Sequence, residues 1–189
     1  YADDPEVRFA LPETDFKALA DRFPADRSSF INEGHVFDIG GMEVETIEVP
    51  GHTAGSVVFC IKGHDILFTG DAIDSGHGVW IFNTEAFNKY ASAVPHLISW
   101  IEDPENGVNA EQLRIYGGHY WQRDWFPELE DKEMGMSYIH EMQALIDEIK
   151  AGTAATEPSG LDHPVLDTYF RYGMAIVVWN AEQAQQIVQ

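Results

Sequence analysis

The sequence has a single cysteine and no long apolar run. A lone cysteine cannot form a disulfide within the chain, and Cys60 lies inside the apolar run 57–61, which is typical of a buried structural thiol. No apolar stretch approaches the roughly 20 residues of a membrane-spanning helix, and no Asn-x-Ser/Thr acceptor occurs. We therefore expect no membrane partner and a cytoplasmic location.

Basic residues are scarce. The chain has 11 Lys and Arg against 32 Asp and Glu, which gives a formal net charge of −21. Nucleic acids and anionic membranes both need basic patches, so this balance disfavours them as partners. The hydrophobic content of 44% argues against a disordered chain, and the length suits one ordinary domain.

Several sequence patterns of common enzymes are also absent. The chain has no Gly-Lys-Ser/Thr phosphate loop, no Gly-x-Gly-x-x-Gly stretch and no Gly-x-Ser-x-Gly nucleophile motif. His140 and Glu141 begin the zinc-protease pattern, but Ala144 stands where that pattern requires a second histidine. We interpret His140 as a surface residue of a helix.

Two short stretches are rich in polar residues that follow glycine. PGHTAGS occupies residues 50–56, and LFTGDA ends at residue 72. Between them, two apolar runs separated by a turn around Gly63 predict an antiparallel hairpin. Its two strands have similar lengths and opposite directions, so the chain returns close to its starting point. His52 and Asp71 should therefore meet at one edge of a sheet, as half of a metal site. A turn histidine and a capping aspartate remain the alternative interpretation.

A third stretch repeats this pattern. Residues 113–116 predict a short strand, and Gly117, Gly118 and His119 follow it directly. Glycine allows the backbone to turn sharply and to approach a ligand closely. Histidine and aspartate are common zinc ligands, so His119 is a third candidate for the same edge.

The order PGHTAGS, LFTGDA and IYGGHY resembles the later metal motifs of the metallo-β-lactamase-fold hydrolase superfamily. The resemblance implies an α+β fold, a four-layer αβ/βα sandwich. It implies that His52 completes a first zinc site, that Asp71 bridges two metals and acts in catalysis, and that His119 binds the second metal. We expect residues 1–189 to form a single domain, the second part of this fold without its N-terminal portion.

The family's defining motif, His-x-His-x-Asp-His, is absent from the sequence. We expect this motif in an upstream part of the same protein, and we expect that part or a neighbouring copy to complete the fold. The run 57–61 is apolar at every position, which predicts a strand buried on both faces. The alternative is a degenerate member of the fold that serves as a binding or scaffold protein without catalysis.

The chemistry that the resemblance implies is zinc-dependent hydrolysis, in which metal-activated water attacks an ester, thioester or lactone-type small molecule. Two zinc ions are expected, although iron or manganese would suit similar ligands. Asp71 stands where some β-lactamases of the superfamily carry cysteine, which favours the glyoxalase-II-like and lactonase-like branches.

Other residues near these stretches are weaker candidates. His77 lies in a Gly-rich loop after Asp71 and is a candidate for substrate binding, as is Tyr120, which follows His119. A packed aromatic pair with Trp121 is the alternative for Tyr120. The remaining histidines, 35, 64, 96 and 163, are expected to be solvated, and Thr53 and Ser56 to form hydrogen bonds within the turn or behind the ligands.

The secondary structure is predicted from apolar spacing and turn residues. Residues 36–49 predict a hairpin, and residues 84–101 and 134–150 predict helices, with Pro95 expected to kink or split the first. Residues 151–164 predict a loop, and residues 168–179 predict one long strand.

Overall fold

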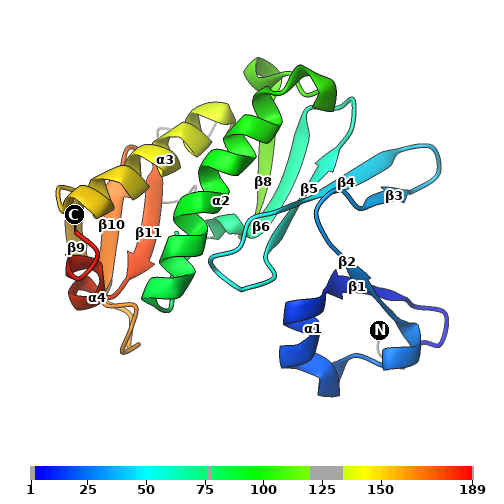
Figure 1. Cartoon of the computed structure of the whole chain (residues 1–189), viewed down its shortest axis with the longest axis horizontal. Helices are drawn as coiled ribbons and strands as arrows, with labels where there is room; N and C mark the ends of the chain where they lie inside the picture. Colours follow the sequence, from blue (N-terminus) through cyan, green and yellow to red (C-terminus); the bar gives the residue numbers. More distant parts are fainter. Residues whose placement is uncertain (1–2, 76–77, 120–133, 189) are drawn as a thin grey trace.

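The computed structural model describes residues 3–75, 78–119 and 134–188. Its helices are α1 Glu13–Leu19, α2 Thr84–Glu102, α3 Met136–Ala151 and α4 Ala181–Gln185. Its strands are β1 Phe9–Pro12, β2 Ser28–Ile31, β3 Val36–Asp38, β4 Glu43–Glu48, β5 Val57–Ile61, β6 Ile66–Ser75, β7 Val79–Trp80, β8 Arg114–His119, β9 Ala155–Pro158, β10 Thr168–Tyr172 and β11 Ala175–Trp179. The chain therefore combines helices and sheets, as the α+β prediction required (Figure 1).

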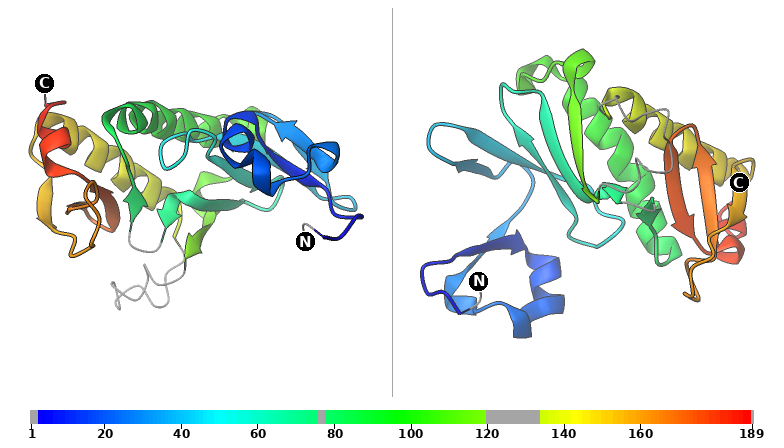
Figure 2. Two further views of the ribbon diagram at one scale, coloured as in Figure 1. Left: turned by 90° about the horizontal axis from the view of Figure 1, so that it is seen from below. Right: turned by 180° about the vertical axis from the view of Figure 1, so that it is seen from behind.

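Two sheets carry most of the strands. A five-stranded sheet has the order β3-β4-β5-β6-β8, and a four-stranded sheet has the order β7-β11-β10-β9. The long helices α2 and α3 lie along the same side of the two sheets (Figure 2). None of the helices in the described ranges is both long enough and apolar enough to cross a membrane.

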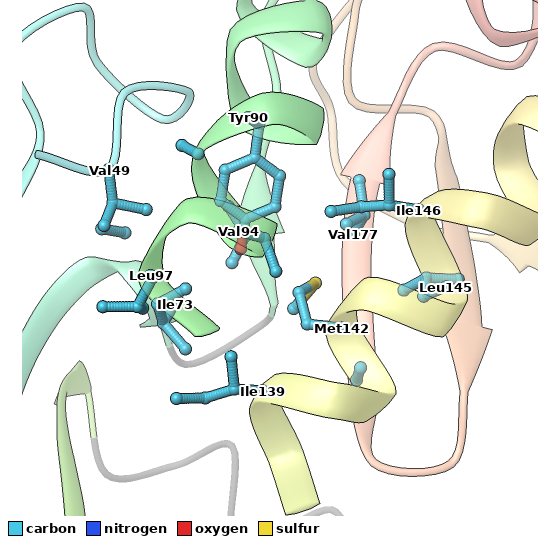
Figure 3. Close-up of a cluster of buried hydrophobic side chains, with 14 of the residues drawn as sticks. Val49, Ile73, Tyr90, Val94, Leu97, Ile139, Met142, Leu145, Ile146 and Val177 are labelled. Carbon is cyan, nitrogen blue, oxygen red and sulfur yellow. The ribbon is translucent and has the colours of Figure 1, made fainter. Parts of the chain in front are cut away.

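The core lies between these helices and the sheets. Tyr90, Val94 and Leu97 from α2 meet Ile139 and Met142 from α3 in one buried cluster (Figure 3). Each of these side chains is fully buried, and a buried aliphatic or aromatic side chain contributes roughly 1.5–3 kcal/mol. The packing of α2 on the sheet fixes β6 on both sides of Asp71, because Leu67 and Ile73 of β6 belong to the same cluster.

The predicted hairpin between the first two motifs is confirmed. β5 and β6 pair antiparallel, with Phe59 opposite Phe68 and Ile61 opposite Ile66. β8 then adds to β6 in parallel, with Phe68 opposite Tyr116. The segment after Asp71 was predicted as a loop, but β6 continues to Ser75, because β8 provides a hydrogen-bonding neighbour on that side.

Pro95 was expected to kink or split its helix, and it does not split it. α2 is one helix, anchored on either side of Pro95 by the buried Val94 and Leu97. Residues 168–179 form two antiparallel strands rather than one, because Gly173 turns the chain with a φ of +56°. β9 lies within the predicted loop and pairs with β10.

The N-terminal unit, residues 3–35, lies beside the larger body and contains α1 and the parallel pair β1–β2 (Figure 1). Glu33 joins this unit to the body, because its carboxylate lies 2.5 Å from Nε2 of His96 on α2. The same carboxylate accepts a hydrogen bond from the backbone N–H of Glu48 at 2.8 Å. His96 was predicted to be solvated, and it is half-exposed and paired.

One face of the five-stranded sheet is apolar and partly open. Along β5, Val58 and Cys60 are fully buried, whereas Phe59 on the opposite face is only partly buried. Phe68 and Tyr116 are neighbours on that same face and are 45% and 41% exposed. Within the described residues, the burial of β5 predicted for both faces is therefore complete on one face only.

Candidate functional site

The three candidate metal ligands lie at the same end of the five-stranded sheet. His52 lies in the loop between β4 and β5, Asp71 lies in β6, and His119 is the last residue of β8. The antiparallel return of β6 and the parallel addition of β8 bring these positions together. The structure thus places the side chains of His52, Asp71 and His119 side by side.

The carboxylate of Asp71 lies between the two imidazoles. Its Oδ2 atom is 3.8 Å from Nε2 of His52, and its Oδ1 atom is 3.4 Å from Nε2 of His119. Two ligand atoms on one tetrahedral zinc ion are about 3.3 Å apart, given bond lengths of about 2.0–2.2 Å. The distance from each histidine nitrogen to its own oxygen of Asp71 is therefore close to the distance expected between two atoms that bind the same ion.

The site is partly exposed to solvent. The side chain of His52 is 19% exposed, whereas those of Asp71 and His119 are 40% and 41% exposed. Across the described ranges, no group of three or more His, Cys, Asp or Glu side chains is arranged to hold a metal ion as it stands. The donor types, two imidazoles and a carboxylate, suit zinc.

Glycine residues allow the strands to approach each other here. Gly70 precedes Asp71 at an irregularity of β6 and has a φ of +51°, a conformation that favours glycine. A Cβ atom on Gly118 would collide with Oδ1 of Asp71. The backbone of β8 therefore approaches the Asp71 carboxylate closely, as the glycines in the sequence predicted.

The orientation of His52 is fixed from the second sheet. Its Nδ1 atom lies 3.1 Å from the carbonyl oxygen of Trp80 in β7. A carbonyl oxygen only accepts, so Nδ1 carries the hydrogen, and Nε2 is the nitrogen that faces Asp71. The ring of Phe82 packs against His52 with centroids 5.7 Å apart.

Hydrogen bonds also order the loop that carries His52. The backbone N–H of Thr53 donates to Oγ of Ser56 at 2.9 Å, and the two hydroxyls are 2.9 Å apart. The backbone N–H of Gly51 donates to the carbonyl oxygen of Thr53. The prediction that Thr53 and Ser56 form hydrogen bonds in this turn is confirmed.

His77 and Tyr120, the candidates for substrate binding, lie outside the described residues, and their roles remain predictions. His163, expected to be solvated, is exposed and packs edge-on against Phe82 with centroids 6.0 Å apart. The contribution of Trp80 was missed, because a backbone carbonyl in a distant strand has no signal in the sequence.

The sequence profile of the metallo-beta-lactamase superfamily matches residues 4–100. This chain belongs to that superfamily. Its solved relatives include a metallo-beta-lactamase from Pontibacter korlensis with a TM-score of 0.51 and 18% identity, over 75% of this chain and 58% of that one. This likeness supports the metallo-β-lactamase fold, and members of the superfamily typically bind metal ions.

Two relatives by sequence have names that describe an activity. An atrochrysone carboxyl ACP thioesterase from Cryptosporiopsis sp. is 32% identical over 71 residues, which are 38% of this chain and 18% of that protein. A hydroxyacylglutathione hydrolase from Chelativorans sp. is 44% identical over 43 residues, 23% of this chain and 17% of that protein. The matched segments thus span less than a fifth of either relative.

Proposed function

We propose that this chain forms part of a metal-dependent hydrolase that acts on an ester, thioester or lactone-type small molecule. The observation that carries the proposal is the position of Asp71 between His52 and His119 at an open sheet edge. Membership of the metallo-beta-lactamase superfamily adds support, because both sequence relatives described above are named as hydrolytic enzymes.

Zinc is the metal that the donor set suits best. Imidazole nitrogens and carboxylate oxygens are common ligands of catalytic zinc, and His52, Asp71 and His119 are the residues that would hold the metal. When bound, the ion would supply an acidic water and polarise the substrate carbonyl. Two ions would need further ligands, which we assign to an upstream part of the same protein or to a neighbouring copy.

The residues of this chain hold and orient that chemistry. The hydrogen bond to Trp80 keeps Nε2 of His52 directed at Asp71. Asp71 presents one oxygen to each histidine, which suits a bridging role and a role in orienting the attacking water. The partial exposure of Asp71 and His119 leaves room for a substrate on the open side.

The substrate proposal follows from charge and from the relatives. A net charge of −21 opposes binding of a polynucleotide, so a small molecule is the substrate class. One relative is a thioesterase and another is a hydroxyacylglutathione hydrolase, which favours a thioester as the first substrate to test.

The open apolar face supports the proposal that further chain completes the fold. Phe59, Phe68 and Tyr116 share this face, and Phe68 and Tyr116 pack at a centroid distance of 5.6 Å. Exposed aromatic surface of this kind is costly unless it is covered. We assign its covering to the upstream part of the same protein or to a neighbouring copy, and residues 1–189 to the second part of one domain.

A binding or scaffold protein of the same fold is the second candidate. It is favoured by the finding that the described residues contain no ready-made group of three metal ligands. Such a protein would keep the sheet edge but would bind zinc weakly or not at all. Zinc affinity therefore separates the two candidates.

The experiment measures hydrolysis by the full-length protein with and without zinc. Simple acyl thioesters, aryl esters and lactones are offered in turn, before and after treatment with a chelator. We expect activity that the chelator removes, that zinc restores and that Asp71→Asn abolishes. Asp26→Asn, which alters an exposed carboxylate of the N-terminal unit, is the matched control and should retain activity. Activity of Asp71→Asn equal to the control would contradict the proposal.

A further inference from the structure

Asp15 on α1 contacts the loop that carries His52, although the two segments are far apart in the sequence. Its Oδ2 atom accepts a hydrogen bond from the hydroxyl of Thr53 at 2.9 Å. Its Oδ1 atom accepts a hydrogen bond from the backbone N–H of Gly55 at 3.0 Å. Both oxygens of one carboxylate are thus used on one loop, and hydrogen bonds to an ionised acceptor are among the stronger ones.

Thr53 is the centre of the hydrogen bonds within this loop. It follows His52 directly, its backbone N–H donates to Oγ of Ser56, and its carbonyl oxygen accepts from Gly51. The contact from Asp15 therefore acts one residue away from the proposed ligand. Any release of Thr53 would loosen the backbone on both sides of His52.

The fit between helix and loop leaves no space at Gly55. A Cβ atom there would lie 2.7 Å from Cγ of Asp15 and 2.7 Å from Oγ1 of Thr14, a distance at which something must shift. Gly55 is itself buried. The second glycine of PGHTAGS is therefore explained by the close approach of α1, rather than by the metal site.

We propose that Asp15 is a positioning residue, which holds the 50–56 loop and thereby sets the place of His52. The N-terminal unit then belongs to the support of the hydrolytic site. The consequence for zinc rests on the proposed function, whereas the ordering of the loop does not. Loss of a group that orients a metal ligand typically weakens metal affinity by about 10–100-fold.

The test compares Asp15→Ala and Asp15→Asn with Asp21→Ala in the full-length protein. Asp21 lies in the same unit and is exposed, so its removal changes the net charge equally without altering the loop. The first measurement is amide hydrogen exchange of peptides covering residues 50–56, without metal or substrate. The second is zinc affinity, measured by competition with a chromophoric chelator.

We expect faster exchange of the 50–56 peptide in Asp15→Ala, with unchanged exchange in α3 and in Asp21→Ala. Zinc affinity should fall by about 10–100-fold in Asp15→Ala and by less in Asp15→Asn, because the amide oxygen can still accept one of the two hydrogen bonds. If Asp15→Ala does not fold, Asp15→Asn carries the test, and the intermediate change is required of it.

The outcomes distinguish the two proposals. Exchange and zinc affinity in Asp15→Ala equal to those of Asp21→Ala would overturn the positioning role. If loop exchange is faster in Asp15→Ala but the wild-type protein binds no zinc, the positioning of the loop is supported and the proposed hydrolase is refuted.

Discussion

The Nδ1 atom of His52 lies 3.1 Å from the carbonyl oxygen of Trp80. His52 belongs to a loop of the five-stranded sheet, whereas Trp80 belongs to β7 of the four-stranded sheet. The candidate site is thus built where the two sheets meet, and it depends on the packing of both. Since a backbone carbonyl holds the imidazole, no side-chain substitution at residue 80 removes this hydrogen bond directly.

Gly118→Ala should impair zinc binding more than it impairs folding. The added methyl group would displace the Asp71 carboxylate, which is partly exposed and can swing away. We expect zinc affinity to fall about ten-fold or more. The free energy of unfolding should fall by no more than the roughly 1–3 kcal/mol that is typical of overpacking. Zinc titration and urea denaturation on the same sample measure the two effects. Unchanged zinc affinity in a folded variant would show that Asp71 does not bind metal from this position.

Tyr90→Phe should not lower stability, whereas Tyr138→Phe should. Both side chains are fully buried, but the hydroxyl of Tyr90 has no partner within the described residues, while that of Tyr138 donates to the carbonyl oxygen of Ile73 at 3.2 Å. An unpaired buried polar group costs about 1–3 kcal/mol, whereas a hydrogen bond contributes about 0.5–1.5 kcal/mol. Urea denaturation should show Tyr90→Phe to be as stable as the wild type or more stable, and Tyr138→Phe to be less stable. A similar loss in both variants would mean that Tyr90 has a hydrogen-bond partner.

Stability should fall between about pH 9 and pH 11 because of Cys60. Burial, with smaller contributions from Glu45 and Asp65, raises the pKa of its thiol from 9.0 to about 11. The raised pKa contributes stability that is complete below the unfolded pKa and is lost as the pH rises toward the folded pKa. The loss across this window should reach up to about 3 kcal/mol. Denaturation at several pH values should give a shallower decline for Cys60→Ala, and an equal decline would contradict this account.

The open apolar face should make residues 1–189 self-associate when they are produced alone. Phe68 and Tyr116 remain exposed there. Burying an apolar side chain of this size stabilises a protein by roughly 1.5–3 kcal/mol relative to leaving it in water. The double substitution Phe68→Ser and Tyr116→Ser should reduce association in analytical ultracentrifugation. Replacing Ile39 and Val188, which are exposed elsewhere, is the control. A monomeric wild-type fragment that melts cooperatively would contradict the requirement for a covering segment.

Local patterns predicted the candidate site well. The hairpin that carries Asp71 back toward His52 depends on adjacent residues, and a turn after Ile61 is enough to define it. The place of His119 followed from a short apolar strand before two glycines. The roles of these residues as ligands, and the extent of the domain, remain predictions.

Contacts between distant segments could not be predicted in the same way. Nothing near Asp15 in the sequence indicates that its carboxylate reaches Thr53, and the carbonyl group of Trp80 is common to every residue type. The turn at Gly173 was missed because apolar residues continue on both sides of it. In the structure, the carboxylate of Glu141 accepts a hydrogen bond from the next backbone N–H, that of Met174, at 2.7 Å.

Zinc binding by the histidine variants tests the central claim most directly. A titration followed by isothermal calorimetry should give tight binding in the wild-type protein, and a loss of at least about ten-fold in both His52→Ala and His119→Ala. Circular dichroism should show the same helix content in all three proteins, because His52 lies in a loop and His119 at the end of a strand, and neither belongs to the buried core. Zinc binding that is equal in the wild-type protein and in both folded variants would contradict the claim that these residues form a metal centre.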